Sequence, residues 1–187
     1  MASVLVLTGS PSAVSRTAAL ARHVGEELAH DGHEVSTLEI RALPPQALLG
    51  ADTADPAISA AVAAVIAADA LVVATPIYKA SYSGLLKAFL DLLPQSALAG
   101  KIVLPLATGG TIAHLLAIDY SLRPVLASLG ARHVTAGRFV LDVHIDHKSG
   151  GPVLIDDTAR ECVTRTADAF REAIRAVADD RSLVATA

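Results

Sequence analysis

Short apolar runs alternate along the chain with longer stretches in which apolar residues recur at a helical spacing. The first run, residues 4–7, reads VLVL and is followed by a stretch of helical period from residue 17 to about residue 29. This pair predicts a strand and then a helix. The same reading predicts strands at 34–38, 70–74, 102–106 and within 134–141, and helices at 57–67, 84–93, 113–129 and 158–177. Five predicted strands therefore alternate with five predicted helices.

The predicted strands indicate a parallel sheet. Continuous apolar runs are typical of strands buried on both faces, and a helical crossover between neighbouring strands makes them parallel. We therefore expect an α/β fold, a doubly wound parallel sheet of five strands with helices on both faces. Two loops, 43–56 and 142–152, interrupt the alternation without marking a domain boundary. Residues 1–180 are expected to form one domain, and residues 181–187 are expected to fray.

Composition narrows the class of protein. The 187 residues are 52% hydrophobic with a formal net charge of -4, and the basic residues are scattered, which disfavours binding to nucleic acid. No apolar run reaches the roughly 18 residues of a membrane span, and we expect no signal peptide. The single cysteine, Cys162, excludes an internal disulfide and suits a reducing compartment, by default the cytoplasm.

The first strand-to-helix loop is a candidate phosphate site, because ligands of such folds bind beyond the carboxyl ends of the strands. Residues 8–17 read TGSPSAVSRT and offer hydroxyl groups, backbone N–H groups, the cation of Arg16 and a helix N-terminus. Together these suit a phosphate monoester. The loop lacks the GxxxxGK[ST] and GxGxxG motifs of nucleoside triphosphate and dinucleotide sites. A Ser/Thr-rich helix cap without a ligand explains the loop equally well.

Two further loops have features of a site for a planar ligand. Residues 75–84 read TPIYKASYSG, and Tyr78 in this loop is suited to lie along a flat ring. Residues 107–114 read ATGGTIAH, and paired glycines let the backbone come close to such a ring. A packed tyrosine with a solvated lysine, and a permissive turn, are the simpler explanations of these two loops.

Three segments together resemble the NADPH-dependent FMN reductase family. They are TGSPS with SRT in the first loop, VVATPIYKASYSGLLKAFLDLLP from residue 72, and GKIVLPLATGGTIAHLLAIDYSLRPVL from residue 100. The resemblance runs from the first strand to about Leu129 and is strongest to the FMN reductase components of alkanesulfonate monooxygenase two-component systems. It implies a flavodoxin-like fold and an enzyme that uses FMN with NADPH, or NADH, since no separate dinucleotide motif distinguishes the two.

The resemblance also implies which residues contact FMN. Phosphate contacts fall on Ser10, Ser15, Arg16 and Thr17, ring and ribityl contacts on Pro76, Ile77, Tyr78, Lys79 and Ser83, and contacts at the ring edge on Thr108, Gly109 and Gly110. Family members with a longer basic loop often have Arg where Ser12 stands, which leaves Arg16 as the cation of this loop. Because the flavin carries the reactivity in hydride transfer, we expect no catalytic acid or base.

Pro124 interrupts the fourth predicted helix. It has no N–H to donate to the C=O of Tyr120, and the N–H of Val125 would instead give that carbonyl an i→i+5 bond. Tyr120 is therefore predicted at a π-bulge, although a plain proline kink explains the same residues. The resembling two-component reductases have an inserted Tyr in a π-helix at a tetramer interface, which favours release of reduced flavin. The resemblance thus implies a homo-oligomer, a tetramer or a dimer.

Three functions fit these observations. The leading hypothesis is an NAD(P)H-dependent FMN reductase that supplies reduced FMN to a flavin-dependent monooxygenase acting on sulfonates. The alternatives are an FMN-retaining reductase of quinones, azo dyes or metal ions, and a flavodoxin-type electron carrier. The mild net charge disfavours the carrier. No metal site is expected, since residues 142–147 are interpreted as a polar loop and Cys162 as a packing residue.

Overall fold

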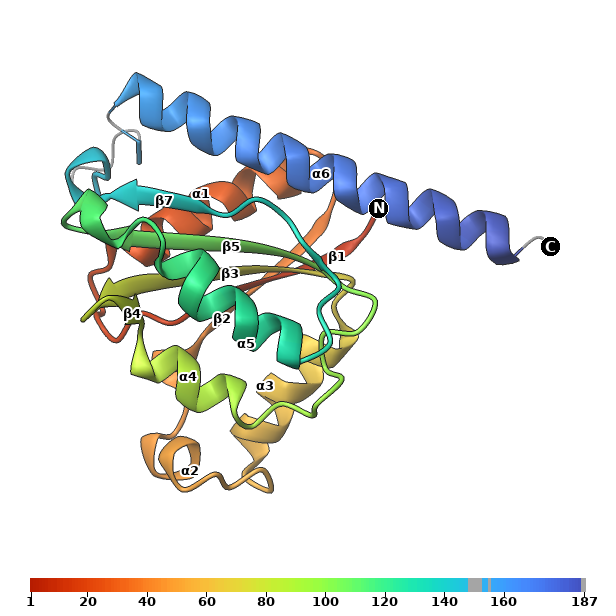
Figure 1. The fold of residues 1–187 in the computed structure, drawn as a ribbon. Helices are drawn as coiled ribbons and strands as arrows, with labels where there is room; N and C mark the ends of the chain where they lie inside the picture. Colours follow the sequence, from red (N-terminus) through yellow and green to blue (C-terminus); the bar gives the residue numbers. More distant parts are fainter. Residues whose placement is uncertain (148–152, 155, 186–187) are drawn as a thin grey trace.

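A mainly parallel sheet of seven strands forms the centre of the molecule (Figure 1). In this computed structural model, residues 1–147, 153, 154 and 156–185 are described. The strands are β1 (Ser3–Thr8), β2 (Glu34–Glu39), β3 (Ala70–Tyr78), β4 (Ser81–Tyr82), β5 (Ile102–Gly109), β6 (His133–Val134) and β7 (Arg138–Leu141). The helices are α1 (Arg16–His30), α2 (Pro45–Leu49), α3 (Pro56–Ala67), α4 (Gly84–Leu90), α5 (Arg123–Ser128) and α6 (Asp157–Ala185), with short helical turns η1 (Ile40–Ala42), η2 (Ile112–His114), η3 (Ile118–Leu122) and η4 (Asp142–His144).

The strand order places a topological switch point at β1. The order is β2-β1-β3-β5-β6, so the chain moves from β1 to β2 on one side and then to β3 on the other. Both neighbours of β1 are parallel to it. In an open sheet of this kind, the crevice beyond the carboxyl ends of the strands at the switch point is the expected ligand site. The predicted α/β doubly wound class is confirmed.

The predicted number of five strands is wrong for two reasons. A two-residue strand, β4, pairs antiparallel with the end of β3. In addition, the single strand predicted within 134–141 is divided into β6 and β7, which both pair with β5. Between these pairings β5 advances from Val103 to Leu106, whereas its partner advances from Val134 to Arg138, one residue more.

Pro105 explains this division. The C=O of Val103 accepts the N–H of Thr135 at 2.9 Å, so Val103 faces the β6 side of β5, and Pro105, two residues further, faces the same side. Because proline has no N–H to give, the ladder is interrupted there and the extra residue forms a bulge. Gly137 fills the gap, since a Cβ at this position would lie 2.9 Å from both Pro105 Cγ and Ile118 Cγ2.

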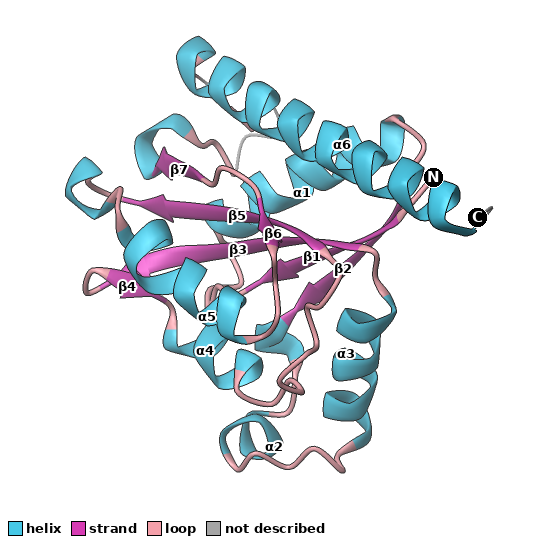
Figure 2. Ribbon diagram, turned by 45° about the vertical axis from the view of Figure 1, so that its right-hand side comes forward, coloured by secondary structure: helices cyan, strands magenta, loops and turns pink. Residues whose placement is uncertain are grey.

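Helices cover both faces of the sheet, as expected (Figure 2). Alternate residues of β1 point to opposite faces. Val4 and Val6 pack with α1 and α6, whereas Leu5 and Leu7 pack with the layer that contains α3, α4 and α5. The sequence reads as continuous apolar runs because both faces of these strands are covered.

Arg171 ties α6 to α1 on one side of this core. Its side chain is only 13% exposed, and its Nε lies 2.5 Å from Asp31 Oδ2 and its Nη2 lies 3.6 Å from Glu27 Oε2. Asp168, one turn earlier in α6, completes the set of ion pairs. The long last helix is thus held at a defined position along α1. Helix α6 runs to Ala185. Fraying of residues 181–187 stays a prediction.

The predicted helix at 113–129 is divided into a 3-10 turn, η2, a π-helix, η3, and the α-helix α5. Tyr120 lies within η3. The N–H of Arg123 donates to the C=O of Ile118, an i→i+5 bond two residues before the pair expected from the sequence. Pro124 falls in the first turn of α5, where its missing N–H costs little.

Two loops contain more structure than predicted. Helix α2 begins at Pro45 within the segment expected to be a plain loop, residues 43–56. Of the loop expected at 142–152, residues 148–152 lie outside the described residues, and η4 occupies its start.

Among the helices of the described residues, none combines the length and the apolar character that a membrane span needs.

Candidate functional site

The loop between β1 and α1 turns tightly and leads into a capped helix. Ser15 is the N-cap of α1, and its Oγ accepts the N–H of Ala18 at 3.1 Å. Earlier in the loop, Ser12 Oγ donates to the C=O of Val14 at 2.7 Å. The remaining N–H groups of the first helical turn have no partner within the helix and carry its positive dipole end. This loop is therefore built to receive an anion.

Buried hydroxyl contacts fix the loop against the rest of the sheet. Thr17 Oγ1 and Thr108 Oγ1 lie 2.6 Å apart, which joins the start of α1 to the end of β5. Ser83 Oγ donates to the C=O of Gly9 at 2.5 Å and accepts the N–H of Leu86 at 3.1 Å as the N-cap of α4. The Ser83 side chain thus joins two loops, and it is not among the residues that line the pocket described below.

The β3–β4 hairpin supplies the second loop. Its strands pair Ile77 with Tyr82 and Tyr78 with Ser81, so Lys79 and Ala80 form a two-residue turn. Both turn residues have positive φ, 50° for Lys79 and 64° for Ala80. Two positive φ values are typical of a type I′ turn, for which Asn-Gly is preferred because asparagine and glycine adopt positive φ at lower cost than lysine and alanine. The turn is therefore strained, and it places the Tyr78 ring at the rim with 50% of the side chain exposed.

Replacing Lys79-Ala80 with Asn-Gly is expected to raise the free energy of unfolding by about 1 kcal/mol, because the new residues adopt positive φ with less strain. In a domain of this size that corresponds to roughly 2–4 °C in Tm. Thermal unfolding followed by circular dichroism measures the change. Lys79→Ala is the control and should leave Tm unchanged, since alanine keeps the strain. A lower Tm for the Asn-Gly variant would contradict the strained turn.

The end of β5 supplies the third loop. Gly109 is the last residue of β5, and a Cβ on it would lie 3.1 Å from Phe139 Cζ on β7. Gly110 is exposed, and the nearest atom to a Cβ built on it is Asp142 Oδ2 at 4.0 Å. The first glycine allows close packing against Phe139, and the second leaves the backbone open toward the crevice.

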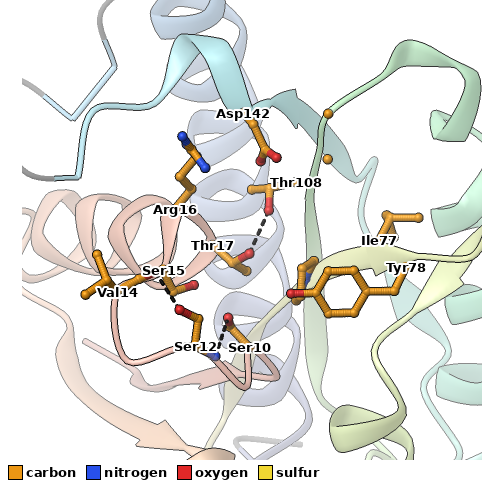
Figure 3. A pocket seen from close by; sticks show the side chains of 13 residues that line it. Ser10, Ser12, Val14, Ser15, Arg16, Thr17, Ile77, Tyr78, Thr108 and Asp142 are labelled. Atoms are coloured by element: carbon orange, nitrogen blue, oxygen red, sulfur yellow. Dashed lines mark hydrogen bonds between the residues drawn. The ribbon is translucent and has the colours of Figure 1, made fainter.

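The three loops enclose one pocket at the switch point, with a volume of about 410 Å³ (Figure 3). It is lined by Ser10, Ser12, Val14, Ser15, Arg16, Thr17, Pro76, Ile77, Tyr78, Thr108, Gly109, Gly110 and Asp142. Every expected contact residue except Lys79 and Ser83 is in this set. Ser12, Val14 and Asp142 are the lining residues that the sequence did not predict. Asp142 follows β7 directly, and in the sequence it is the first residue of the polar loop expected after the strand within 134–141, with no motif that indicates a site.

The pocket has little net charge. Among its lining residues, Arg16 is the cation and Asp142 the anion. The other polar groups are hydroxyls and backbone amides. A ligand in this pocket is therefore held by hydrogen bonds more than by a strong electrostatic field. In β4, burial raises the pKa of the Tyr82 phenol above its ordinary value.

The π-helix η3 lies against the hairpin of the pocket. Ser121 Oγ in η3 and Ser81 Oγ in β4 are 2.5 Å apart. Arg123, at the end of η3, donates through Nη1 to the C=O of Val134 at 2.8 Å and through Nη2 to the C=O of Thr135 at 3.1 Å. Its Nε also donates to Asp119 Oδ1 at 3.1 Å. The π-helix is therefore fixed to the sheet on one side and to the β3–β4 hairpin on the other.

A doubly wound sheet with a hydroxyl-rich loop at its switch point places this protein in the flavodoxin-like class. Comparison with known proteins agrees. The crystal structure of the apo form of an NADH:FMN oxidoreductase, EmoB, superposes with a TM-score of 0.84 and 45% sequence identity, over 92% of this chain and 90% of that one.

The sequence matches narrow this class. The model of a family described as NADPH-dependent FMN reductase matches residues 2–146. The FMN reductase (NADPH) of Escherichia coli strain K12 is 47% identical over 142 residues, which cover 76% of this chain and 74% of that protein. An NADH-dependent FMN reductase of Pseudomonas putida, SfnF, is 37% identical over 144 residues, covering 73% and 75%. The chain belongs to the NADPH-dependent FMN reductase family.

The protein is accordingly an NAD(P)H-dependent FMN reductase, as predicted, with FMN and a reduced nicotinamide nucleotide as its ligands. When bound, the flavin accepts a hydride at its ring system. The pocket fits such a ligand, because it combines an anion-binding helix start with an open diglycine and an exposed tyrosine ring.

Proposed function

We propose that this enzyme uses FMN as an exchangeable substrate and supplies reduced FMN to a flavin-dependent monooxygenase that acts on sulfonates. The observation that carries the proposal is the pocket's lining, in which the exposed Arg16 is the cation and the other donors are hydroxyls and backbone amides. A phosphate dianion held by one exposed cation, hydroxyls and amides is held modestly, and a modest hold suits a ligand that must leave. The relatives SfnE and SfnF, which are named as NADH-dependent FMN reductases, support FMN as the molecule that is reduced.

In this proposal, different residues of the pocket contact different parts of the flavin. Ser10, Ser15, Arg16 and Thr17 hold the phosphate at the start of α1. Pro76, Ile77 and Tyr78 contact the ring on one side, and Thr108, Gly109 and Gly110 contact its edge through backbone N–H groups. Lys79 and Ser83 act at a distance, Lys79 through the hairpin turn and Ser83 through its bonds to Gly9 and Leu86.

We further propose that the chain forms a homo-oligomer, a tetramer or a dimer, through the surface of η2 and η3. Four large apolar side chains are exposed there, namely Ile112 (67%), Leu115 (48%), Leu116 (58%) and Tyr120 (80%). Exposed apolar side chains that gather on neighbouring turns are typical of an interface between proteins. Because η3 contacts the hairpin at Ser81, such an interface would lie close to the flavin pocket.

The exchange of FMN is tested by NADPH oxidation at a fixed, low enzyme concentration. Without added flavin the purified protein should be colourless and nearly inactive. With FMN in large excess over enzyme, the rate should rise with FMN and saturate, because each flavin leaves after reduction. The reduced flavin should then support turnover of an alkanesulfonate by an added flavin-dependent monooxygenase.

Two results would contradict the proposal. A yellow protein whose rate is independent of added FMN but rises with quinones, azo dyes or ferric ions would identify a flavin-retaining reductase of the same fold. A reduced protein that passes electrons only to another protein would instead identify a flavodoxin-type carrier. NADH in place of NADPH, assayed side by side, determines the nicotinamide preference.

A further inference from the structure

Asp142 enters the pocket next to β7, a strand that holds none of the flavin contacts expected from the sequence. It is the first residue after β7, and β7 runs beside the end of β5, with Leu141 opposite Gly109. Its Oδ2 lies 4.0 Å from the position of a Cβ built on Gly110. Figure 3 shows its carboxylate directed toward Thr108, on the same side of the pocket as Arg16. The side chain therefore belongs to the wall of the pocket.

The Asp142 carboxylate is free to accept hydrogen bonds from a ligand. Within the described part of the chain it takes part in no hydrogen bond or ion pair, although its own C=O accepts the N–H of Ile145 at 3.3 Å. A carboxylate has only acceptor oxygens, whereas the lining otherwise offers hydroxyls, amides and a guanidinium. A carboxylate shielded from water by a bound ligand needs a donor from that ligand.

Its position along the pocket indicates which part of a flavin meets it. One end of the pocket is the phosphate-binding loop, residues 10–17, and the other end is formed by Pro76, Tyr78 and the two glycines. Asp142 lies near Thr108 and Gly110, between these ends. The hydroxyls of Thr17 and Thr108 are 2.6 Å apart and one donates to the other, so Asp142 is the charged acceptor among the lining residues of this middle region.

We propose that the Asp142 carboxylate accepts hydrogen bonds from the ribityl hydroxyls of the flavin and makes the pocket selective for flavins that carry this polyol chain. The inference rests on the proposed placement of FMN in this pocket. Hydroxyl groups that donate to a carboxylate form charge-assisted bonds, which are stronger than neutral ones. They fix the chain that connects the phosphate to the ring without adding positive charge to the site.

The test compares three flavins that differ only in the groups attached to the ring. FMN has the ribityl chain and the phosphate, riboflavin lacks the phosphate, and lumiflavin lacks both. Dissociation constants are measured by quenching of flavin fluorescence for the wild-type protein, Asp142→Ala and Asp142→Asn. Asp142→Ala should weaken FMN and riboflavin about tenfold each and leave lumiflavin unchanged. Asp142→Asn keeps an acceptor oxygen, so its affinity for FMN and riboflavin should fall less.

Two control variants are measured with the same three flavins. Glu34→Gln changes the net charge by the same amount at the amino end of β2, away from the pocket, and should change no dissociation constant. Arg16→Ala should weaken FMN about tenfold but leave riboflavin unchanged, because riboflavin has no phosphate. Circular dichroism and thermal unfolding confirm that each variant folds.

The outcomes are distinct. Tighter binding of FMN by Asp142→Asn with riboflavin unchanged would mean that the carboxylate acts by repelling the phosphate, which overturns the inference. Equal losses for all three flavins would mean that Asp142 shapes the ring site, and no losses would mean that it does not touch the ligand, so both also overturn it. Failure of the proposed function is recognised separately, by wild-type protein that oxidises NADPH independently of added FMN.

Discussion

Replacing Gly9 with alanine is expected to lower the free energy of unfolding by about 3 kcal/mol and to weaken flavin binding. Gly9 follows β1 directly, and a Cβ at this position would lie 2.6 Å from Leu86 Cβ, 3.1 Å from Ser83 Oγ and 3.4 Å from Leu86 Cα. A change of rotamer does not move the Cβ of Leu86, and Leu86 is fully buried in α4, so the clash needs a backbone shift. Either α4 or the phosphate loop must move.

Chemical unfolding and flavin titration measure the two effects. In a domain of this size a loss of 3 kcal/mol corresponds to roughly 6–12 °C in Tm. Gly84→Ala is the matched control, since no atom lies within 4 Å of a Cβ built there and this glycine begins the same helix. It should be neutral or slightly stabilising, because alanine favours the helix. Wild-type stability in Gly9→Ala would mean that the close approach of β1 and α4 is not as described.

Deletion of Tyr120 is expected to convert the enzyme into a protein that retains FMN during purification, with an affinity higher by about a hundredfold, ~2.7 kcal/mol. In η3 the N–H of Arg123 reaches back five residues to the C=O of Ile118. Removing one residue between them makes this an i→i+4 bond, so the segment becomes α-helical while Ile118 and Arg123 keep their partner. The exposed Tyr120 ring is lost, and Ser121 is shifted relative to Ser81.

Tyr120→Ala separates the two consequences of the deletion. This variant removes the ring but keeps the residue count, and hence the i→i+5 register. If the register controls flavin release, the deletion variant should be yellow after gel filtration and Tyr120→Ala colourless. Absorbance at the flavin bands per chain gives the result. A colourless deletion variant that is folded by circular dichroism would rule out control of release by the π-helix.

The sequence predicts this fold well where burial leaves a clear pattern. β1, β3 and β5 are covered on both faces, so each is a continuous apolar run, and the helices between them make the sheet parallel. The prediction failed at β6 and β7, because the bulge there is caused by Pro105 on a neighbouring strand. No pattern within residues 133–141 records that missing donor. The two-residue strand β4 is likewise fixed by pairing with β3 and not by its own residues.

The candidate site shows the same limit. The loop proposed to bind phosphate is recognisable because its hydroxyls, cation and helix start are consecutive in the sequence. Asp142 was read as part of a polar loop, since only the pairing of β7 with β5 brings it beside Gly110. Ser83 has the right type for a ligand contact, but its hydroxyl is engaged with Gly9 and Leu86, which local sequence cannot reveal.

The bond between Ser81 and Ser121 would connect two equilibria in the proposed homo-oligomer. A copy of the chain docked on η3 would change the energy of the hairpin that carries Tyr78, so assembly and flavin binding would be thermodynamically linked. By reciprocity, flavin would then shift the association constant of the subunits by the same factor by which association shifts flavin affinity. Dilution of such an oligomer would itself change its affinity for FMN.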